Sequence, residues 1–377
     1  MTRENPASQV PARAIPDAEN AGLRERLGAD PLVWTDAMLA ALKSGVKGGK
    51  WFSLKDKVYR RRTLLRAWHI VNGRGGSGGV DRVSLKQYES QLDQRLASLE
   101  RKLKTGRYEP KPVKRVFIPK PGGKEKRPLG IPTVEDRIVQ TALQLVIGPI
   151  FEIGFNAHSY GFRPGRGCKD ALREVDGLLR KGREWIVDAD LKSYFDTIDH
   201  DKLMSLVRAK VADGLVLDLL ESYLKQGLIN ELKEWEPTEK GTPQGAVISP
   251  LLANLYLNEL DHLLRDRGHE MVRYADDFVI LCRSKERAEE ALELTRRWTD
   301  GRGLVLHPEK TRLVTHREGF EFLGYRFENG NRYVRQKSLT KLRGTLRPKT
   351  KRTKGKSMKA IIEDINPVLI GWFGDYK

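Results

Sequence analysis

The sequence predicts an α+β fold built on an antiparallel sheet. Residues 184–190 form an apolar stretch that ends in acid, and residues 271–281 have the pattern of two short strands around a tight turn. Helical segments occur around these strands without strict alternation of strand and helix, which argues against a parallel sheet. Apolar residues make up 39% of the 377, which is enough for a core and argues against wholesale disorder. The length suits two or three packed units.

The N-terminal part of the chain is predicted to be a tail followed by basic helices. Residues 1–49 begin with a run rich in alanine, proline and charge, and we expect a mobile tail there. Residues 51–68 turn helical and carry the cluster Arg60-Arg61-Arg62. The glycine-rich run at 73–79 lacks the Gly-Lys-Ser/Thr of a phosphate-binding loop, so it is interpreted as a flexible connector. Leucines recur at three- or four-residue steps over 84–104, which predicts an amphipathic helix.

The later part of the chain shows both strand-like alternation and the three- or four-residue spacing of helices. Residues 114–118 alternate like a strand and lead into a loop rich in proline and glycine at 119–124. Residues 341–359 hold nine Lys and Arg in nineteen positions, and residues 360–377 have helical apolar spacing. Further helices are predicted at 135–147, 201–225, 250–264 and 286–298.

Charge and cysteine content narrow the class of protein. The chain has 69 Lys and Arg against 50 Asp and Glu, a formal charge of 69 − 50 = +19, so a polyanion is the first partner to consider. Two cysteines, Cys168 and Cys282, cannot build a disulfide framework or a four-cysteine zinc site, and they suit a reducing cytosol. The sequence has no apolar run of about 18 residues and no apolar signal core after Met1. Secretion and membrane insertion are therefore not expected.

Two groups of carboxylates lie at strand ends. Tyr274-Ala275-Asp276-Asp277 places two adjacent acids at a turn between β-prone flanks, and Asp188 and Asp190 end the strand at 184–190. Taken alone, an Asp-Asp pair is equally consistent with a solvated turn. Two acidic strand ends together can share a pair of Mg²⁺ ions, which clamp the attacking hydroxyl and the leaving phosphate oxygen of an in-line displacement. In a basic protein, this pattern favours phosphoryl transfer on nucleic acid.

Seven blocks follow one another in a fixed order along the chain. They are Val113–Ile131, Ser159–Arg166, the strand ending at Asp190, Gly241–Asn254, Tyr274–Asp277, Gly303–Thr311 and Phe322–Tyr325. In content and order these blocks resemble the reverse transcriptases encoded by group II introns, also called maturases. The resemblance covers residues 50–370, and Gly79-Val80-Asp81 resembles the N-terminal extension block of the same family.

The resemblance implies a right-hand polymerase, with fingers, a palm that contains the antiparallel sheet, and a partial helical thumb. It divides the chain into a mobile N-terminal tail (1–49), an RNA-binding N-terminal extension (50–112), reverse transcriptase fingers and palm (113–335), and a basic linker with a truncated thumb or maturase X domain (336–377). Family members usually continue well beyond the block at 366–372, whereas five residues follow it here. We therefore expect most of the thumb, a DNA-binding domain and a His- and Cys-rich endonuclease tail to be absent.

The same resemblance assigns the catalytic acids. Asp190 and Asp276 would ligate two Mg²⁺ ions, with Mn²⁺ as an alternative, and the Leu191 carbonyl would complete one site. Asp277 would be the third catalytic acid, in a supporting position. For Asp188, local hydrogen bonding and metal binding are equally open. Asp196 and Asp199 are expected to cap the following turn and helix.

Five residues match those that surround the incoming nucleotide in the family: Lys120, Arg127, Phe195, Gln244 and Lys310. Lys120 and Arg127 would hold the triphosphate, because negative charge builds up on the leaving pyrophosphate. Gln244 would contact the base or sugar, and Lys310 is a further candidate beside the nucleotide. Phe195 would pack under the sugar and exclude a 2′-hydroxyl, although plain core packing is an alternative.

Other residues match positions that contact primer and template. Arg163 and Arg166 would touch the backbone of the template or nucleotide side, and Gly324 and Tyr325 would position the primer end. The basic stretch at 341–359 is interpreted as an RNA-binding entry to the thumb, with a disordered linker as the alternative. The Arg60-Arg61-Arg62 cluster is a second candidate contact with intron RNA.

The function implied is that of an RNA-directed DNA polymerase that uses an RNA template, a DNA primer and dNTPs. It would also bind group II intron RNA and assist splicing, as a cytoplasmic, nucleoprotein-associated protein of a bacterium. One alternative is a splicing cofactor without polymerase activity, although such a protein has no need of Asp190, Asp276 and Asp277. Another is a reverse transcriptase recruited to phage defence, which Ala275 disfavours. An RNA-templated RNA polymerase is disfavoured by Phe195.

Overall fold

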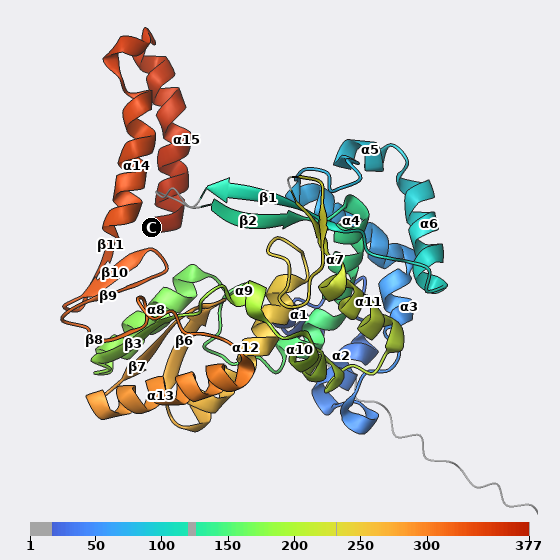
Figure 1. The fold of residues 1–377 in the computed structure, drawn as a ribbon, viewed down its shortest axis with the longest axis horizontal. Helices are drawn as coiled ribbons and strands as arrows, with labels where there is room; N and C mark the ends of the chain where they lie inside the picture. Colours follow the sequence, from blue (N-terminus) through green and yellow to red (C-terminus); the bar gives the residue numbers. More distant parts are fainter. Residues whose placement is uncertain (1–16, 120–125, 231, 377) are drawn as a thin grey trace, which may run out of the picture.

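The computed structural model describes residues 17–119, 126–230 and 232–376. Within these residues, the strands form three separate sheets, and helices pack around two of them (Figure 1). The sheet that carries the predicted acids is antiparallel throughout. The predicted α+β fold with an antiparallel sheet is confirmed.

The N-terminal part is a group of helices packed around one long helix, α7 (Val134–Glu152). Thr133 caps the start of α7 by accepting a hydrogen bond from the Asp136 amide, and nearly every side chain through the middle of the helix is buried. α4 packs along α7. The surrounding helices are α1 (Asp17–Leu27), α2 (Asp36–Ser44), α3 (Lys55–Tyr59), α4 (Arg61–Arg74), α5 (Leu85–Glu89) and α6 (Leu92–Lys104), with a 3₁₀ turn at Lys47–Gly49.

Residues 17–49 belong to this helical group, so the prediction of a mobile tail over 1–49 is wrong for them. The Trp34 side chain is fully buried, and its indole N–H donates to the Leu145 carbonyl of α7 at 2.9 Å. Leu39 of α2 is also fully buried. The charged, alanine-rich sequence at the start hides this packing, because a few large apolar residues are enough to attach two short helices. Residues 1–16 lie outside the described part of the chain.

A β-hairpin projects from this helical part. Strands β1 (Val113–Pro119) and β2 (Lys126–Ile131) pair antiparallel, with Pro119 opposite Lys126. The short strands β4 (Leu228–Ile229) and β5 (Trp235–Glu236) extend the sheet in the order β2-β1-β4-β5. The predicted loop between β1 and β2, and Lys120 with it, lies outside the described residues.

The central sheet has the strand order β6-β7-β3-β8. Its strands are β3 (Trp185–Asp190), β6 (Glu270–Tyr274), β7 (Asp277–Cys282) and β8 (Arg312–Thr315). Helices α8 (Cys168–Arg180), α12 (Ser249–Asp266) and α13 (Lys285–Arg302) pack against this sheet. The short helix α9 (Tyr194–Thr197) follows β3, and α10 (His200–Arg208) packs against α12 and α11 (Gly214–Lys225).

Alternate side chains of the central strands enter two different cores. Val187 and Ile280 pack with residues of α12 and α13, whereas Ile186 and Val279 pack with residues of α8 and of the short strand β9 (Phe320–Phe322). Both faces are therefore covered, which explains why the strands are apolar along most of their length. By the same alternation, Asp188 and Asp190 share the face of Ile186.

The C-terminal part is a small sheet followed by a helical hairpin. The sheet has the order β11-β10-β9, from β9 (Phe320–Phe322), β10 (Tyr325–Glu328) and β11 (Asn331–Val334). Helices α14 (Gln336–Lys349) and α15 (Met358–Tyr376), with a 3₁₀ turn at Arg352–Lys354 between them, stand away from the rest of the chain (Figure 1).

The hairpin corrects the expectation of a basic linker that begins at residue 336. Leu339, Leu342 and Leu346 form a half-buried stripe on α14, and the cations lie around this stripe. Lys349 and Asp364 pair across the two helices at 2.6 Å. An apolar stripe at three- and four-residue steps is enough to hold a strongly basic segment in a helix.

Two predicted helices are each split in two. The segment at 201–225 breaks because Asp213 caps α11, accepting from the Val216 amide, and also accepts from the amides of Leu54 and Lys55 at 2.8 and 2.9 Å. The segment at 84–104 breaks between α5 and α6.

None of the helices in the described part of the chain is both long enough and apolar enough to cross a membrane.

His269, just before β6, makes the stability of the fold depend on pH. Burial lowers the pKa of His269 below its ordinary value of 6.5, and the nearby Arg287 lowers it further, whereas Glu290 opposes the shift. The unfolded chain therefore binds a proton at a higher pH than the folded chain, so stability is lost as the pH falls below about 6.5.

We expect His269→Gln to flatten this dependence. The free energy of unfolding of the wild type should fall by up to about 1.4 kcal/mol per pH unit more steeply than that of the variant below pH 6.5. Urea unfolding at a series of pH values measures both slopes. Equal slopes would show that His269 does not contribute to the acid sensitivity.

Candidate active site

Antiparallel pairing brings the predicted acids together. Asp190, the last residue of β3, lies opposite Asp277, the first residue of β7. Tyr274 of β6 also pairs with Asp277, so Ala275 and Asp276 are the two central residues of the turn between β6 and β7. Asp188 lies two residues before Asp190 in β3, and its side chain is on the same face of the sheet. The four carboxylates therefore meet at one end of the central sheet.

Burial and mutual repulsion perturb these acids. Burial, followed by the negative charges of Asp188, Asp276 and Asp190, raises the pKa of Asp277 to about 7. Burial also raises the pKa of Asp276, and the charge of Asp190 adds to the shift. Carboxylates gathered in this way are unfavourable unless cations or protons balance them.

Two basic residues stand against the acids. The Lys310 ammonium lies 2.6 Å from an Asp190 carboxylate oxygen. Arg312 of β8 is opposite Asp188 in the sheet, and its guanidinium lies 3.0 Å from that carboxylate. Of the two alternatives for Asp188, this geometry favours local hydrogen bonding. Lys310, predicted to lie near the nucleotide, contacts a catalytic acid directly.

The chemistry of the acids fits a divalent cation. Carboxylate oxygens are the ligands that Mg²⁺ prefers, and in the described part of the chain Lys310 pairs with Asp190 whereas no ion pair reaches Asp276 or Asp277. Leu191 follows Asp190 and bridges to Leu306, which holds its backbone beside the acids. Among the described residues, no group of three or more His, Cys, Asp or Glu side chains lies close enough together to hold a metal ion as they stand.

Arg127 and Gln244 meet beside the acids. The Arg127 Nε–H donates to the Gln244 side-chain oxygen at 2.8 Å, and the Gly130 amide donates to the Gln244 carbonyl at 2.7 Å. These bonds dock the loop at 241–245 against β2. Gly245 adopts φ +107°, and a Cβ there would lie 2.5 Å from the Gly130 carbonyl oxygen, so glycine is required at this position.

Phe195, five residues after Asp190, contacts this loop. Its carbonyl accepts from the Thr242 amide at 2.7 Å, and its ring packs edge-on against Tyr194, with the ring centroids 5.5 Å apart. Phe195 is 8% exposed, whereas Tyr194 is almost fully buried and donates to the Ala253 carbonyl at 2.7 Å. Tyr194 is thus the core aromatic of the pair.

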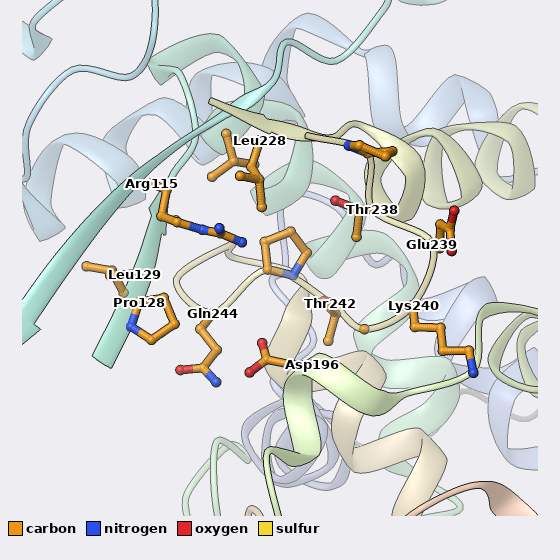
Figure 2. Close-up of a pocket in the computed structure, with 15 residues that line it drawn as sticks. Arg115, Pro128, Leu129, Asp196, Leu228, Thr238, Glu239, Lys240, Thr242 and Gln244 are labelled. Atoms are coloured by element: carbon orange, nitrogen blue, oxygen red, sulfur yellow. The ribbon is translucent and has the colours of Figure 1, made fainter. Parts of the chain in front are cut away.

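A pocket of about 240 Å³ opens between the β1–β2 hairpin and the loop at 241–245. Figure 2 shows Arg115, Asp196 and Gln244 around it. Asp196, expected to cap the following turn, lies within α9, and among the described residues its carboxylate makes no hydrogen bond to that turn. Its carboxylate lines the pocket instead, where burial raises its pKa and Arg115 opposes the shift. Asp199 does cap α10, accepting from the Lys202 amide at 2.9 Å, as expected.

The prediction that Arg163 contacts template is wrong. Its side chain is 3% exposed and pairs with Glu152 at 2.7 Å. It also donates to the carbonyls of Asn156 and Ser159 at 2.5 and 2.6 Å, so its donors are consumed inside the protein. Arg166 is half-buried, donates to a backbone carbonyl and lies over the Tyr160 ring, 5.5 Å from its centroid.

Tyr325 packs against the C-terminal helix, and the predicted role of Gly324 and Tyr325 in positioning the primer end stays a prediction. Tyr325 is 6% exposed and packs against Tyr376 of α15, with the ring centroids 5.4 Å apart. Gly324 has φ +86°, and a Cβ there would lie 3.2 Å from the Tyr376 hydroxyl. These two residues seat the C-terminal helix. The neighbouring Leu323 amide hydrogen-bonds Asp277, which keeps this loop beside the acids.

Sequence reasoning missed Arg273, which precedes the catalytic turn. It is one of the largest fully buried side chains in the described structure, and it contacts Asp261 and the turn itself. The signal was present in the sequence, because a charged residue inside an apolar strand requires a buried partner. The sequence does not show which residue that partner is. It is Asp261, which lies on α12 two turns after Asn254.

An antiparallel sheet with acids at the ends of adjacent strands, below a basic hairpin and beside a buried aromatic, defines the palm of a nucleic-acid polymerase. Residues 118–327 match the protein family described as reverse transcriptase (RNA-dependent DNA polymerase). The chain therefore belongs to the reverse transcriptase family. This confirms the family and the right-hand polymerase fold expected from the sequence.

Three individual comparisons accompany the family match. The chain is 37% identical over 288 residues to Protein YkfC of Escherichia coli, covering 66% of this chain and 75% of that protein. It is 41% identical over 169 residues to the group II intron-encoded protein LtrA of Lactococcus lactis, covering 45% of this chain and 28% of LtrA. A solved partial Cas6-RT-Cas1–Cas2 complex has a chain with 24% identity and a TM-score of 0.42, covering 66% of this chain and 42% of that one.

Relatives encoded by group II introns confirm the resemblance found in the sequence. The chain spans about a quarter of LtrA and three quarters of YkfC.

Proposed function

We propose that this chain is an RNA-directed DNA polymerase of the group II intron type, which copies RNA into cDNA. The observation that carries the proposal is the meeting of Asp190, Asp276 and Asp277 at the end of the central sheet, inside the matched family region. A palm that served only to bind RNA would gain nothing from gathering three half-buried carboxylates, because their repulsion destabilises the fold.

Two Mg²⁺ ions are the proposed cofactors, with Mn²⁺ as an alternative. Asp190 and Asp276 would hold them, Asp277 would support the ligand set, and the Leu191 carbonyl would complete one site. When bound, such a pair stabilises the charge on both the attacking and the leaving oxygen. Lys310 stands 2.6 Å from Asp190 and supplies positive charge at the place where a triphosphate would approach.

The fingers residues would position the dNTP. This role of Arg127 is supported by its hydrogen bond to Gln244, which lines the pocket, and by its positive charge, which opposes the rise that burial causes in the pKa of both Asp276 and Asp196. Gln244, held by Arg127 and Gly130, presents its amide to the same space. Lys120, expected to hold the triphosphate, and the loop at 120–125 remain predictions outside the described residues.

Nucleic acid is the proposed partner of the basic surfaces. The charge of +19 and the cations on α14 suit an RNA template, a DNA primer and group II intron RNA. We propose residues 50–112 as an RNA-binding extension, with Arg60-Arg61-Arg62 at its centre. Assistance of intron splicing is the further role that the relation to an intron-encoded protein supports. The bacterial sources of two relatives support a bacterial, nucleoprotein-associated setting.

Primer extension on an RNA template tests the proposal. Purified protein with dNTPs and Mg²⁺ should produce cDNA, and omission of either should abolish it. RNA binding is measured in parallel over a range of salt concentrations, because contacts with phosphate weaken steeply with salt. Tight, salt-sensitive RNA binding without cDNA would overturn the polymerase proposal in favour of a splicing cofactor.

Phe195→Ala tests the proposed exclusion of ribonucleotides. We expect the ratio of dNTP to rNTP incorporation to fall by about 10- to 200-fold, the range over which a change in pocket shape discriminates similar substrates. Single-nucleotide incorporation with dGTP and GTP measures the ratio. Because Tyr194 is the neighbouring core aromatic, Tyr194→Phe serves as the control and should keep the wild-type ratio. If Phe195→Ala still rejects rNTPs, Phe195 is a core residue only.

A further inference from the structure

The catalytic turn has a backbone conformation that needs external support. Ala275 has φ 59°, in the left-handed region, where glycine is the favoured residue in tight hairpin turns. An alanine held there costs about 1–3 kcal/mol and persists only where the surroundings impose it. Because Asp276 is the next residue, whatever holds Ala275 also sets the position of the Asp276 carboxylate.

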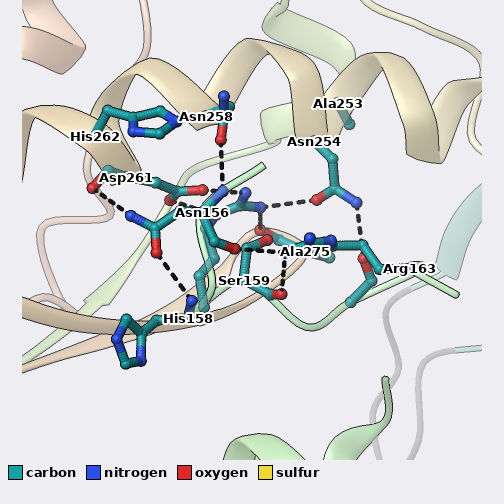
Figure 3. Close-up of polar contacts among 12 residues, drawn as sticks. Asn156, His158, Ser159, Arg163, Ala253, Asn254, Asn258, Asp261, His262 and Ala275 are labelled. Atoms are coloured by element: carbon teal, nitrogen blue, oxygen red, sulfur yellow. Dashed lines mark hydrogen bonds and ion pairs between the residues drawn. The ribbon is translucent and has the colours of Figure 1, made fainter. Parts of the chain in front are cut away.

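Arg273 supplies one part of that support (Figure 3 shows its partners). Its Nη1 donates to the Ala275 carbonyl at 2.8 Å and to the Asn254 side-chain oxygen at 2.9 Å. The other side of the guanidinium forms a two-point ion pair with Asp261, at 2.7 and 2.6 Å. Arg273 and Asp261 side chains are 1% and 2% exposed, so the pair is dry and rigid.

The segment at 158–161 supplies the other part. Its backbone pairs with β6, because the Arg273 amide donates to the His158 carbonyl at 2.9 Å and the Tyr160 amide donates to the Arg273 carbonyl at 2.8 Å. The Asn254 amide group then donates to the Gly161 carbonyl at 2.7 Å. Asn254 therefore connects the Arg273 guanidinium to the Gly161 carbonyl beside the turn.

Gly161 lies directly against the turn. A Cβ at this position would stand 2.4 Å from the Ala275 nitrogen and 3.0 Å from the Tyr274 carbonyl carbon. Both are backbone atoms, so the clash cannot be relieved by rotating a side chain. The hydrogen bond from Asn254 also prevents Gly161 from moving away.

We propose that Arg273, Asn254 and Gly161 form a positioning device that holds the Ala275–Asp276 turn, with Arg273 at the Ala275 carbonyl and Gly161 against the Ala275 nitrogen, and so sets the place of the catalytic carboxylate. The proposal rests on the polymerase function proposed above. None of the three residues needs to touch substrate, because each acts through the backbone of the turn. The function of the block around Gly161 is therefore to support the turn.

Gly161→Ala is the first test, with Gly177→Ala as its matched control. A Cβ at Gly177, on α8, meets nothing within 4 Å, so this variant should keep wild-type activity. We expect Gly161→Ala to lower kcat on the order of 100-fold, the cost of moving a reacting group by about 1 Å, with an unchanged KM for primer–template. A loss confined to KM, or no loss, would overturn the proposal.

A second readout does not depend on activity. Binding of Mn²⁺ alone, followed by the loss of its free-ion electron paramagnetic resonance signal, should be about 10- to 100-fold weaker in Gly161→Ala than in Gly177→Ala. If the wild type makes no cDNA while Mn²⁺ binding differs in this way, the polymerase function fails and the positioning device stands. Equal Mn²⁺ affinity in the two variants would overturn the device.

The double variant Arg273→Met with Asp261→Leu tests the arginine. Removing both charges avoids leaving a buried carboxylate unpaired, and replacement of such a pair by apolar residues is often neutral for stability. A purely structural role for Arg273 predicts normal kcat in the folded double variant. We expect at least a tenfold loss of kcat, because Ala275 and Asn254 lose their donor. Buried acceptors without a donor also lower stability, so kcat is measured well below the melting temperature of the variant. If the double variant unfolds, Asn254→Ala, which keeps the ion pair, should show the same loss of kcat.

Discussion

Replacement of Asp276 by alanine should reduce cDNA synthesis on the order of 1,000-fold or more. The carboxylate stands on the turn between β6 and β7, beside Asp190 and Asp277, where the proposed ions would bind. Stabilisation of transition-state charge by a metal ion is worth several kcal/mol, and each 1.36 kcal/mol corresponds to a factor of ten in rate. Primer extension under single-turnover conditions measures the loss.

Asp201→Ala is the matched control for this experiment. Asp201 is an exposed residue in the first turn of α10, so its removal should leave the rate within twofold of the wild type. The Asp276→Ala protein should also bind RNA with wild-type affinity, since the basic surfaces are unchanged. Extension by Asp276→Ala at a rate near that of Asp201→Ala would exclude the proposed site.

Replacement of Trp34 by alanine should lower the free energy of unfolding by about 3–5 kcal/mol, as is usual for a large buried aromatic. Trp34 is fully buried, packs edge-on against Trp51 with the ring centroids 5.5 Å apart, and donates to the Leu145 carbonyl. The variant loses the ring contacts and leaves that carbonyl of α7 without its partner. Urea unfolding followed by circular dichroism measures the change.

Leu32→Ala in the same segment is the control. Leu32 is 52% exposed, so its truncation should change stability by no more than about 0.5 kcal/mol. If Trp34→Ala is as stable as Leu32→Ala, the helices at 17–49 do not contribute to the fold, and the prediction of a mobile tail would be correct for them.

The parts of the fold that depend on local sequence pattern were predictable. The strands ending at Asp190 and Tyr274, the hairpin around Asp276 and the helices α12 and α13 follow directly from apolar periodicity. Antiparallel pairing then leaves few ways to arrange two acidic strand ends, so the meeting of Asp190 with Asp277 could be expected.

The orientation of individual polar side chains was not predictable. Arg163 and Arg166 occupy one motif, yet Arg163 is buried on Glu152 while Arg166 stays half-exposed. Asp196 and Asp199 have similar sequence surroundings, yet Asp196 lines the pocket and Asp199 caps a helix. Each outcome depends on a partner far away in the sequence, and periodicity carries no information about such partners.

The chemistry of this protein is written in its linear order of residues: acids at two strand ends, cations in excess and an aromatic five residues after Asp190. Which residues carry that chemistry, and which support it, follows from the packing of distant segments. Arg273 and Gly161 acquire their role because α12 and the segment at 158–161 close around the turn at Ala275. A buried charge such as Arg273 needs a partner of opposite charge, and a close backbone contact such as that at Gly161 needs a residue without a Cβ. Both requirements arise only once distant segments have packed together.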